Sequence, residues 1–236
     1  MYEFSSNIRY SECSPDSHLS LHALVNYFQD CAVGHACSVD RGPDTWRDEH
    51  YGWMVTVWQI RIKRYPKLGE VVRVRTQPYR FRGFEADRNI AMFDEDGEMI
   101  ALADSRWIYF DTEAGRPIRI PEIEITSYGV DPEIPLDVPK FQRHIKTPTE
   151  NVQSKQPFKV RATNLDANGH VNNEQYIQMA LAYLPAGIRV KELRVQYLKQ
   201  AVLGDLLEPK VCRNEDGYTV WLELMGRPCA VMQFIL

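Results

Sequence analysis

The sequence lacks the features that mark membrane, secreted and disulfide-stabilised proteins. In its 236 residues, purely apolar runs are only a few residues long, far below the roughly 20 that a transmembrane helix needs. The first residues show neither the basic-then-apolar pattern of a signal peptide nor the Arg-rich pattern of a transit peptide. Five scattered cysteines form no CxxC pair, so we expect reduced thiols. These absences predict a cytoplasmic protein with no stable membrane insertion.

Strong net charge and cofactor motifs are also missing. The 28 Lys and Arg residues nearly balance the 32 Asp and Glu residues, whereas a nucleic-acid-binding domain is usually basic with a concentrated positive face. The sequence contains no GxSxG elbow, P-loop or dinucleotide fingerprint. His18 and His22 have a metal-like spacing, but no third ligand follows at a known interval. We therefore predict no nucleic-acid partner, no cofactor and no metal site.

Proline divides the chain. Half of the 14 prolines fall between residues 117 and 157, where neither helical nor strand periodicity persists: Pro117, Pro121, Pro132, Pro135, Pro139, Pro148 and Pro157. A structureless stretch of this length is uncommon inside one compact domain. It predicts an N-terminal unit over 1–116, a connector over 117–157 and a C-terminal unit over 158–236.

The two units resemble each other. His18 in the first corresponds to His170 in the second, an offset of 152 residues, and each His precedes an apolar segment with helical spacing. These apolar positions are Leu21, Leu24, Val25 and Phe28 in the first unit and Tyr176, Met179, Ala180 and Tyr183 in the second. Further along, Gly69 corresponds to Gly204 at an offset of only 135. The first unit therefore carries extra residues, which we place between residues 35 and 55.

Strand patterns follow each predicted helix. After extended segments at 59–62 and 194–197, three strands are expected in each unit: 70–79, 84–93 and 99–110 in the first, and 205–213, 218–225 and 229–235 in the second. An antiparallel meander with one central apolar helix buries both elements if the sheet wraps the helix. The predicted fold is therefore α+β, a double hotdog with two such units in tandem.

The segment NLDANGHVNN, residues 164–173, is the densest polar cluster of the chain. Asp166, Asn168 and His170 alternate, so an extended backbone would point their side chains to one side. Asn172 or Asn173 supplies a cap for the following helix, whose N-terminus offers free N–H groups and a positive dipole end. Asn, Asp and Gly are also common turn residues, so a capped turn is the structural alternative.

At this point the chain resembles a known family, the acyl-acyl-carrier-protein thioesterases of bacteria and plant plastids, which are double-hotdog hydrolases. The segment NYFQD in the first predicted helix is similar to the family's NYxQD, and DANGHVNN is similar to its D-x-N-x-H-V-N-N motif. The resemblance implies hydrolysis of a fatty acyl thioester with Asp166, Asn168 and His170 as catalytic residues. Helix N–H groups at Val171, Asn172 and Asn173 would stabilise the oxyanion.

One position departs from the family pattern. Where the family commonly has Glu, followed in plant members by Cys, this chain has Gln200 and Ala201. A cysteine nucleophile at this place is therefore excluded. An amide does not take a proton from water, so the general base is either Asp166 or His170.

The resemblance also implies an acyl pocket and a carrier partner. We expect Trp53, Val55 and Val57 of the first unit to line the acyl pocket. Basic residues of the same unit's strands, chiefly Arg80, Arg82 and Arg88, either form a solvated sheet face or dock an acidic acyl carrier protein with its acylated phosphopantetheine arm.

The same fold leaves alternatives open. These are an acyl-CoA thioesterase, a hotdog hydratase or dehydratase, and a non-catalytic acyl-thioester binding protein. Dehydratases usually show His followed by Phe or Pro-Gly, whereas His170 precedes Val-Asn-Asn. A homodimer is a further expectation.

Overall fold

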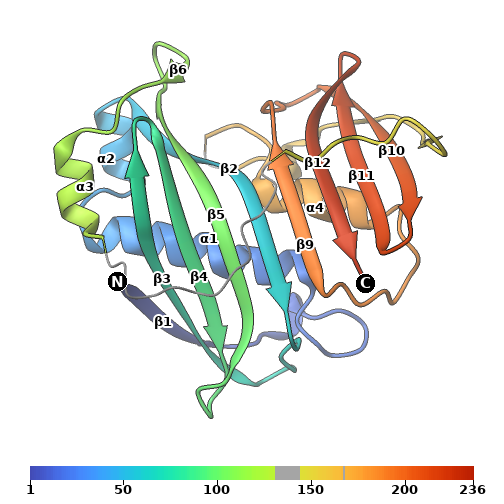
Figure 1. Ribbon diagram of the computed structural model, residues 1–236, viewed down its shortest axis with the longest axis horizontal. Coiled ribbons are helices and arrows are strands. Elements are labelled where there is room, and N and C mark those ends of the chain that lie inside the picture. The colour runs from blue at the N-terminus through green and yellow to red at the C-terminus, as the bar shows by residue number, and fades with distance from the viewer. Residues whose placement is uncertain (131–143, 167) are drawn as a thin grey trace. The chain divides into compact units, whose positions relative to one another are not determined.

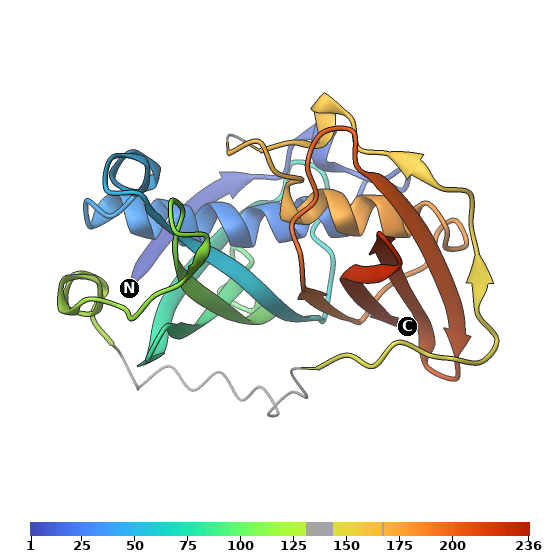
Figure 2. The same ribbon diagram turned by 90° about the horizontal axis from the view of Figure 1, so that it is seen from above.

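The computed structural model describes residues 1–130, 144–166 and 168–236 (Figure 1). The chain forms two compact units, Met1–Phe141 and Gln142–Leu236. Each unit consists of an antiparallel sheet and one principal helix. In Figure 2 the helix of each unit lies on one side of that unit's own strands. The predicted α+β class with two hotdog units is confirmed.

The N-terminal unit has its strands in the order β1-β3-β4-β5-β2, with β6 paired to β5. Its helix α1 packs over β1, β3 and β4. The elements are β1 (Tyr2–Asn7), a 3-10 turn (Tyr10–Glu12), α1 (Leu21–Ser38), α2 (Pro43–Asp48), β2 (Tyr51–Ile62), β3 (Val71–Arg82), β4 (Glu85–Phe93), β5 (Met99–Asp111), β6 (Arg116–Pro117) and α3 (Glu122–Tyr128).

The C-terminal unit has its strands in the order β9-β12-β11-β10-β7, with β8 also paired to β10. Its helix α4 packs over β11 and β12. The elements are β7 (Gln153–Ser154), β8 (Phe158–Lys159), a 3-10 turn (Ala162–Asn164), α4 (Asn173–Leu181), β9 (Glu192–Tyr197), β10 (Leu206–Asn214), β11 (Gly217–Leu224) and β12 (Arg227–Ile235). The strand segments predicted from alternation are therefore confirmed in both units.

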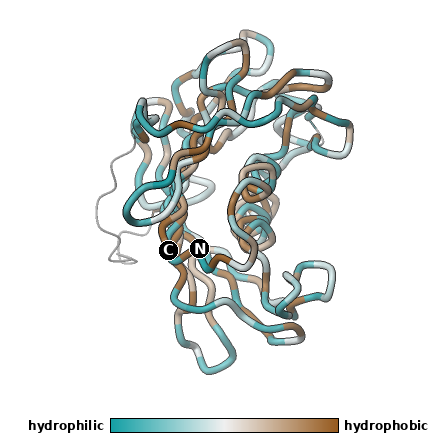
Figure 3. Tube along the Cα trace, turned by 90° about the vertical axis from the view of Figure 1, so that its right-hand side faces the viewer, coloured by the Kyte–Doolittle hydropathy of each residue, from teal (hydrophilic) through white to brown (hydrophobic). Residues whose placement is uncertain are grey.

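Apolar spacing explains the two principal helices. The four apolar positions predicted for the first helix are all buried on α1, and the Ser20 hydroxyl caps its start by accepting the N–H of Ala23 at 3.4 Å. On α4 the buried residues are Tyr176, Ile177 and Ala180 together with Glu174. The helix ends at Leu181, so the prediction that Tyr183 lies on it is wrong. Figure 3 shows hydrophobic colouring along the strands and helices and hydrophilic colouring at many turns.

The internal repeat is visible in the backbone. Before α1, the N–H of Ser14 donates to the carbonyl of His18 at 2.8 Å. Before α4, the N–H of Asp166 donates to the carbonyl of His170, also at 2.8 Å. Both pairs are separated by the 152-residue offset found in the sequence. Each principal helix is therefore entered through the same kind of turn.

The extra residues of the N-terminal unit have a structural counterpart. Helix α1 has 18 residues and α4 has nine, and α2 follows α1 within the interval 35–55. The segment 117–157, expected to be a connector, contains α3 and β7, while 131–143 lies outside the described residues. No helix in the described part of the chain is long and apolar enough to cross a membrane.

Replacing Leu24 by Ala tests the packing of α1. Leu24 is fully buried, so the substitution leaves a cavity and should lower the free energy of unfolding by about 2–5 kcal/mol. Urea unfolding followed by circular dichroism measures this loss. Leu68, which is 44% exposed, is the matched control, and Leu68→Ala should change stability by less than about 0.5 kcal/mol. Equal effects of the two substitutions would contradict the packing described here.

Candidate active site

The DANGHVNN segment forms a closed turn at the entry to α4. The N–H of Asp166 donates to the carbonyl of His170, and the N–H of Gly169 donates back to the carbonyl of Asp166 at 3.1 Å. Gly169 has a φ of 78°, a conformation that glycine adopts without steric cost. The extended backbone that we expected here is therefore wrong, because hydrogen bonding between residues 166 and 170 closes the chain locally.

The carboxylate of Asp166 holds this turn together. One oxygen, Oδ1, accepts the N–H of Asn168 at 2.8 Å and the N–H of His170 at 3.2 Å. Within the described residues no other hydrogen bond reaches this carboxylate. Asp166 can therefore serve both the turn and a reaction. Its Oδ1 holds the loop through these two hydrogen bonds, whereas its Oδ2 accepts no hydrogen bond from the described residues.

The turn brings Asn168 and His170 next to Asp166. Asn168 is exposed and His170 is half-buried. The backbone of His170 pairs with Val202 in an isolated antiparallel bridge, which fixes its position against the segment after β9. In the described part of the chain, no hydrogen bond reaches the side chain of either residue. The backbone of both residues is therefore bound to the Asp166 carboxylate, while their side chains make no hydrogen bond to the described residues.

The start of α4 offers fewer free N–H groups than the sequence suggested. The N–H of Val171 donates to the carbonyl of Ala201, and the N–H of Asn172 donates to the carbonyl of Asn164, both at 2.9 Å. Asn172 is the N-cap, and its side chain accepts the N–H of the second helical residue at 3.5 Å. Among the three expected oxyanion donors, Asn173 is the one whose N–H has no acceptor among the described residues.

Gln200 lies on the segment that runs beside this turn. Its side chain is exposed, and the next residue, Ala201, is buried and accepts the Val171 N–H. The N–H of Ala201 donates to the hydroxyl of Tyr176 at 2.9 Å. The backbone segment that contains Gln200 therefore runs alongside His170 and Val171.

Sequence reasoning missed the polar groups that support the turn. Tyr176 was assigned only to an apolar helix face, yet its hydroxyl binds the Ala201 backbone. The hydroxyl of Tyr197 donates to the carbonyl of Asn173 at 2.8 Å. Asn164 donates through Nδ2 to the side-chain oxygen of Gln175 at 2.8 Å. The 152-residue repeat could have indicated Asn164, because it corresponds to Glu12. The carbonyl of each residue accepts the N–H of the residue that caps the following helix.

Two buried thiols are poor nucleophiles. Burial raises the pKa of Cys229 in the C-terminal unit to about 11 and that of Cys31 on α1 to about 12, and the thiolate is the reactive form. No group of three His, Cys, Asp or Glu side chains in the described chain is placed to hold a metal ion.

The N-terminal unit contains a small apolar cavity of about 30 Å³. This volume is far below the roughly 300–1,000 Å³ of ligand sites. Three indole rings line it, those of Trp46, Trp53 and Trp107. Of the three residues expected in an acyl pocket, Trp53 is therefore on the cavity wall, whereas Val55 and Val57 are buried elsewhere in β2.

The three arginines expected on a docking face differ in their surroundings. Arg88 is buried, and its guanidinium donates to the side chains of His35 and Thr76 at 3.0 Å. Placing Arg88 on a docking surface was therefore wrong, because β4 turns this side chain toward α1. Arg80 is paired with Asp87 through Nε at 2.6 Å, and Arg82 is exposed.

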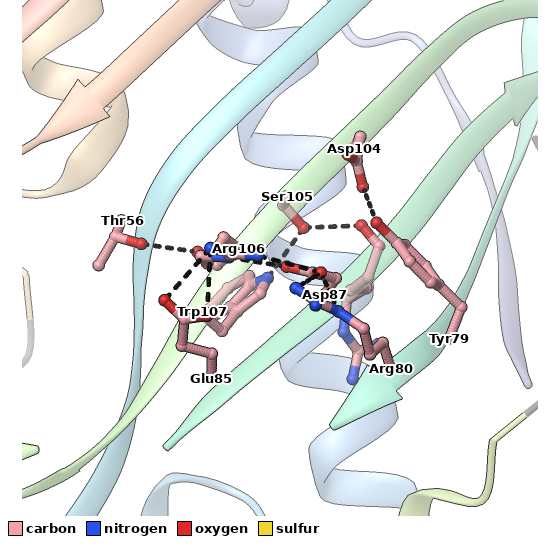
Figure 4. A network of polar contacts seen from close by, with 10 residues as sticks. Thr56, Tyr79, Arg80, Glu85, Asp87, Asp104, Ser105, Arg106 and Trp107 are labelled. Carbon is pink, nitrogen blue, oxygen red and sulfur yellow. Dashed lines mark hydrogen bonds and ion pairs between the residues drawn. The ribbon is translucent and has the colours of Figure 1, made fainter. Parts of the chain in front are cut away.

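A polar network occupies the sheet face of the N-terminal unit opposite α1 (Figure 4). Asp87, with 3% of its side chain exposed, accepts from Arg80 and also from Arg106 at 2.8 Å. Nearby, the hydroxyl of Tyr79 donates to Asp104 at 2.9 Å. Burial raises the pKa of Asp104 to about 6, and the Tyr79 hydrogen bond opposes this shift. Asp104 therefore titrates in a range where a surface Asp is already ionised.

Comparison with known proteins identifies relatives for both units. The model of the acyl-ACP thioesterase N-terminal domain matches residues 1–128, and that of the acyl-ACP thioesterase C-terminal domain matches residues 147–226. The palmitoyl-acyl carrier protein thioesterase of Arabidopsis thaliana chloroplasts is 27% identical over 219 residues. This match covers 86% of the present chain and 52% of the plant protein. The chain thus spans about half the length of the curated plant relatives it matches.

Solved structures of similar proteins support the fold. An acyl-ACP thioesterase from Bacteroides thetaiotaomicron has a TM-score of 0.87 at 24% identity, with 99% of this chain and 96% of that chain covered. The 12:0-ACP thioesterase from Umbellularia californica has a TM-score of 0.83 at 20% identity, with 99% and 96% covered. The double-hotdog fold predicted above is thereby confirmed.

The raised pKa of Asp104 predicts a pH-dependent stability. The folded state holds its proton up to about pH 6, whereas the unfolded chain loses it near the ordinary value of 3.8. The contribution of protonated Asp104 is therefore complete below about pH 4 and is lost as pH rises through 6. Relative to Asp104→Asn, wild-type stability should fall by at most about 3 kcal/mol between pH 4 and 7.

Urea unfolding of both proteins at several pH values measures this difference. Asp96→Asn is the control, because Asp96 is exposed on the turn between β4 and β5. A wild-type minus Asp104→Asn difference that stays constant from pH 4 to 7 would show that Asp104 is not buried in a proton-favouring environment.

Proposed function

The chain belongs to the acyl-ACP thioesterase family, and on that premise we propose that it hydrolyses the thioester of a fatty acyl group carried by acyl carrier protein. The products are the free fatty acid and the carrier thiol. The observation that carries this proposal is the turn at the entry to α4, where the carboxylate of Asp166 accepts the backbone N–H groups of Asn168 and His170 just before the helix N-terminus. These groups match the requirements of water-mediated acyl transfer.

The proposed reaction begins with attack of a water molecule on the thioester carbonyl. Asp166, directly or through His170, takes the proton from that water as its oxygen bonds to carbon. The C–S bond then breaks, and the thiolate sulfur takes a proton to leave as the thiol. Oδ1 of Asp166 is occupied by two backbone N–H groups, so Oδ2 is the oxygen assigned to the proton transfer.

Two groups are suited to stabilise the charge that develops on the carbonyl oxygen. The N–H of Asn173 is the donor left at the start of α4, where the helix dipole is positive. Asn168, five residues before Asn173 in the sequence, is exposed, and its side-chain amide is assigned to orient either the water or the carbonyl. One such donor is worth about 3–4 kcal/mol in the transition state of comparable acyl-transfer sites.

The assay that tests the proposed function uses panels of acyl carrier protein and acyl-CoA substrates. Thiol release reports hydrolysis, and absorbance of an enoyl product reports a hydratase or dehydratase instead. Hydrolysis of acyl-ACP with little activity on acyl-CoA supports the proposal. Enoyl formation, or binding of acyl-ACP without any turnover, would overturn it in favour of the other hotdog classes.

The substitution Asp166→Asn distinguishes the role of Asp166 as a base from its role in holding the turn. An Asn side-chain oxygen can still accept both backbone N–H groups that Oδ1 accepts, so the turn is retained, but the amide cannot take a proton. We expect kcat to fall roughly 100-fold or more. Gln200→Ala should cost much less, because a neutral amide at this place only orients water, and Gln200→Glu should be tolerated.

The measurement is kcat against pH for the three variants, with folding checked by circular dichroism. Near-native turnover of Asp166→Asn combined with inactive Gln200→Ala would assign the essential role to His170 and Gln200 instead. A second carboxylate introduced by Gln200→Glu should also move the pH optimum upward, because like charges raise one of the two pKa values.

Carrier docking is proposed for the exposed end of β3. Arg82 is exposed there, whereas the charge of neighbouring Arg80 is neutralised by Asp87. Arg82→Glu should raise KM for acyl carrier protein and leave hydrolysis of a short neutral thioester nearly unchanged. Added salt should weaken the carrier interaction in the same way. Arg227→Glu makes the same charge change on the C-terminal unit, at an exposed position, and equal effects of the two variants would contradict a local docking site.

A further inference from the structure

The segment that joins β9 to β10 exposes four apolar side chains. Each of these residues is between 43% and 60% exposed: Leu198, Val202, Leu203 and Leu206. Single apolar residues on a surface need no explanation, but these four all fall within residues 198–206 of the C-terminal unit. We call this set the C-terminal patch.

The N-terminal unit contains the same turn between β2 and β3. There the carboxylate of Glu70 accepts the backbone N–H of Lys67 at 2.9 Å. In the C-terminal unit the carboxylate of Asp205 accepts the backbone N–H of Val202, also at 2.9 Å. Both pairs are related by the 135-residue offset of the internal repeat, so the two turns have the same internal hydrogen bond.

The side chains at equivalent positions of the two turns differ in character. The counterpart of Leu198 is Lys63, and the counterpart of Val202 is Lys67. Both lysines are exposed. The turn therefore forms with lysine at these two positions, and its fold does not require apolar side chains there. Exposed apolar residues that the fold does not need indicate a contact with another molecule.

Two exposed lysines border the C-terminal patch. Lys199 belongs to the same segment, and Lys159 on β8 lies opposite Leu206 in the ladder between β8 and β10, so both side chains point to one face of the sheet. Neither lysine has an ion-pair partner among the described residues, whereas Arg64, the counterpart of Lys199, binds two carboxylates at 2.7 and 2.8 Å. The border of the patch therefore carries positive charge that is not neutralised within the described chain.

The C-terminal patch adjoins the candidate active site. The backbone of Val202 forms an antiparallel bridge with His170, and the carbonyl of Ala201 accepts the N–H of Val171 at 2.9 Å. All of these residues belong to the C-terminal unit. A molecule bound on the patch is therefore next to the turn that carries Asp166 and His170.

We propose that the C-terminal patch binds the acyl carrier protein, through an apolar side chain of the carrier at the patch and acidic groups of the carrier at Lys159 and Lys199. This inference rests on the proposed function. An apolar centre with a charged border is the usual composition of a protein interface. An anionic lipid surface has similar chemistry, but the carrier is favoured because the thioester that it holds must reach the adjoining turn. Arg82 lies in the other unit and is tested by its own variant.

The apolar contact is tested by Leu203→Asn. Calorimetric titration with holo-carrier protein, which bears the arm with a free thiol, measures the Kd of the complex. The substitution removes apolar area without adding charge and should raise the Kd about 10-fold. Leu68→Asn is the matched control, because Leu68 has the same place in the turn of the N-terminal unit, and it should change the Kd by no more than about 2-fold. Equal effects of the two variants, or no carrier binding by the wild type, would overturn the proposal.

The charged border is tested by Lys199→Gln. This variant should bind the carrier more weakly, and its Kd should depend less on salt concentration than that of the wild type. Lys191→Gln is the control, because Lys191 is exposed and lies at the opposite end of β9, and it should keep the salt dependence of the wild type. The same salt dependence in all three proteins would overturn the role of Lys199.

These titrations do not depend on turnover, because holo-carrier contains no thioester. If no acyl-ACP is hydrolysed, the proposed function fails, while the Kd values still decide whether the patch binds the carrier. Sedimentation with vesicles of equimolar phosphatidylcholine and phosphatidylglycerol tests the lipid alternative. Vesicle binding that Leu203→Asn abolishes, with carrier affinity unchanged, would overturn the proposal in favour of a lipid surface. A wild-type dimer that Leu203→Asn dissociates, again with carrier affinity unchanged, would overturn it in favour of a second copy of the chain.

Discussion

Both units depend on how the chain enters its principal helix. In the C-terminal unit, the N–H of Asn172 is tied to Asn164 and the N–H of Val171 to Ala201, so backbone bonds hold the loop on both sides. These bonds anchor α4 to its flanking segments and also place His170. Stability and chemistry therefore use the same hydrogen bonds, and a change that loosens the loop affects both. The N-terminal unit has the same turn, and the backbone bond from Ser20 to Glu12 corresponds to the bond from Asn172 to Asn164.

Strand β4 shows how one sheet separates two kinds of polar environment. Asp87 and Arg88 are adjacent and both are buried, but alternation sends them to opposite faces. On one face the carboxylate of Asp87 is bound by two arginines. On the other face the guanidinium of Arg88 has only neutral partners among the described residues. In the first arrangement, arginine charges balance the carboxylate charge. In the second, the Arg88 charge is held by the neutral side chains of His35 and Thr76.

The proposed division of labour follows from these two features. The C-terminal unit carries the turn with the carboxylate, amide and imidazole, and the N-terminal unit carries the aromatic cavity with its single charged group. Because this chain has Gln200 where the family commonly has Glu, we assign proton transfer to Asp166 or His170 of the turn. The burial of Arg88 was not visible in the sequence, where this residue could not be distinguished from a surface arginine.

Periodicity and repeats determined much of this protein without tertiary information: the α+β class, the apolar face of α1, most strand positions and the DANGHVNN motif. These features are local, because an alternating or helical pattern depends on neighbouring residues. Only the tertiary structure decided that residues 166–170 close into a turn, that the Val171 N–H is engaged by Ala201, and that Arg88 is buried. Each of these features depends on which segments the folded backbone brings together. The identity of a side chain does not specify that.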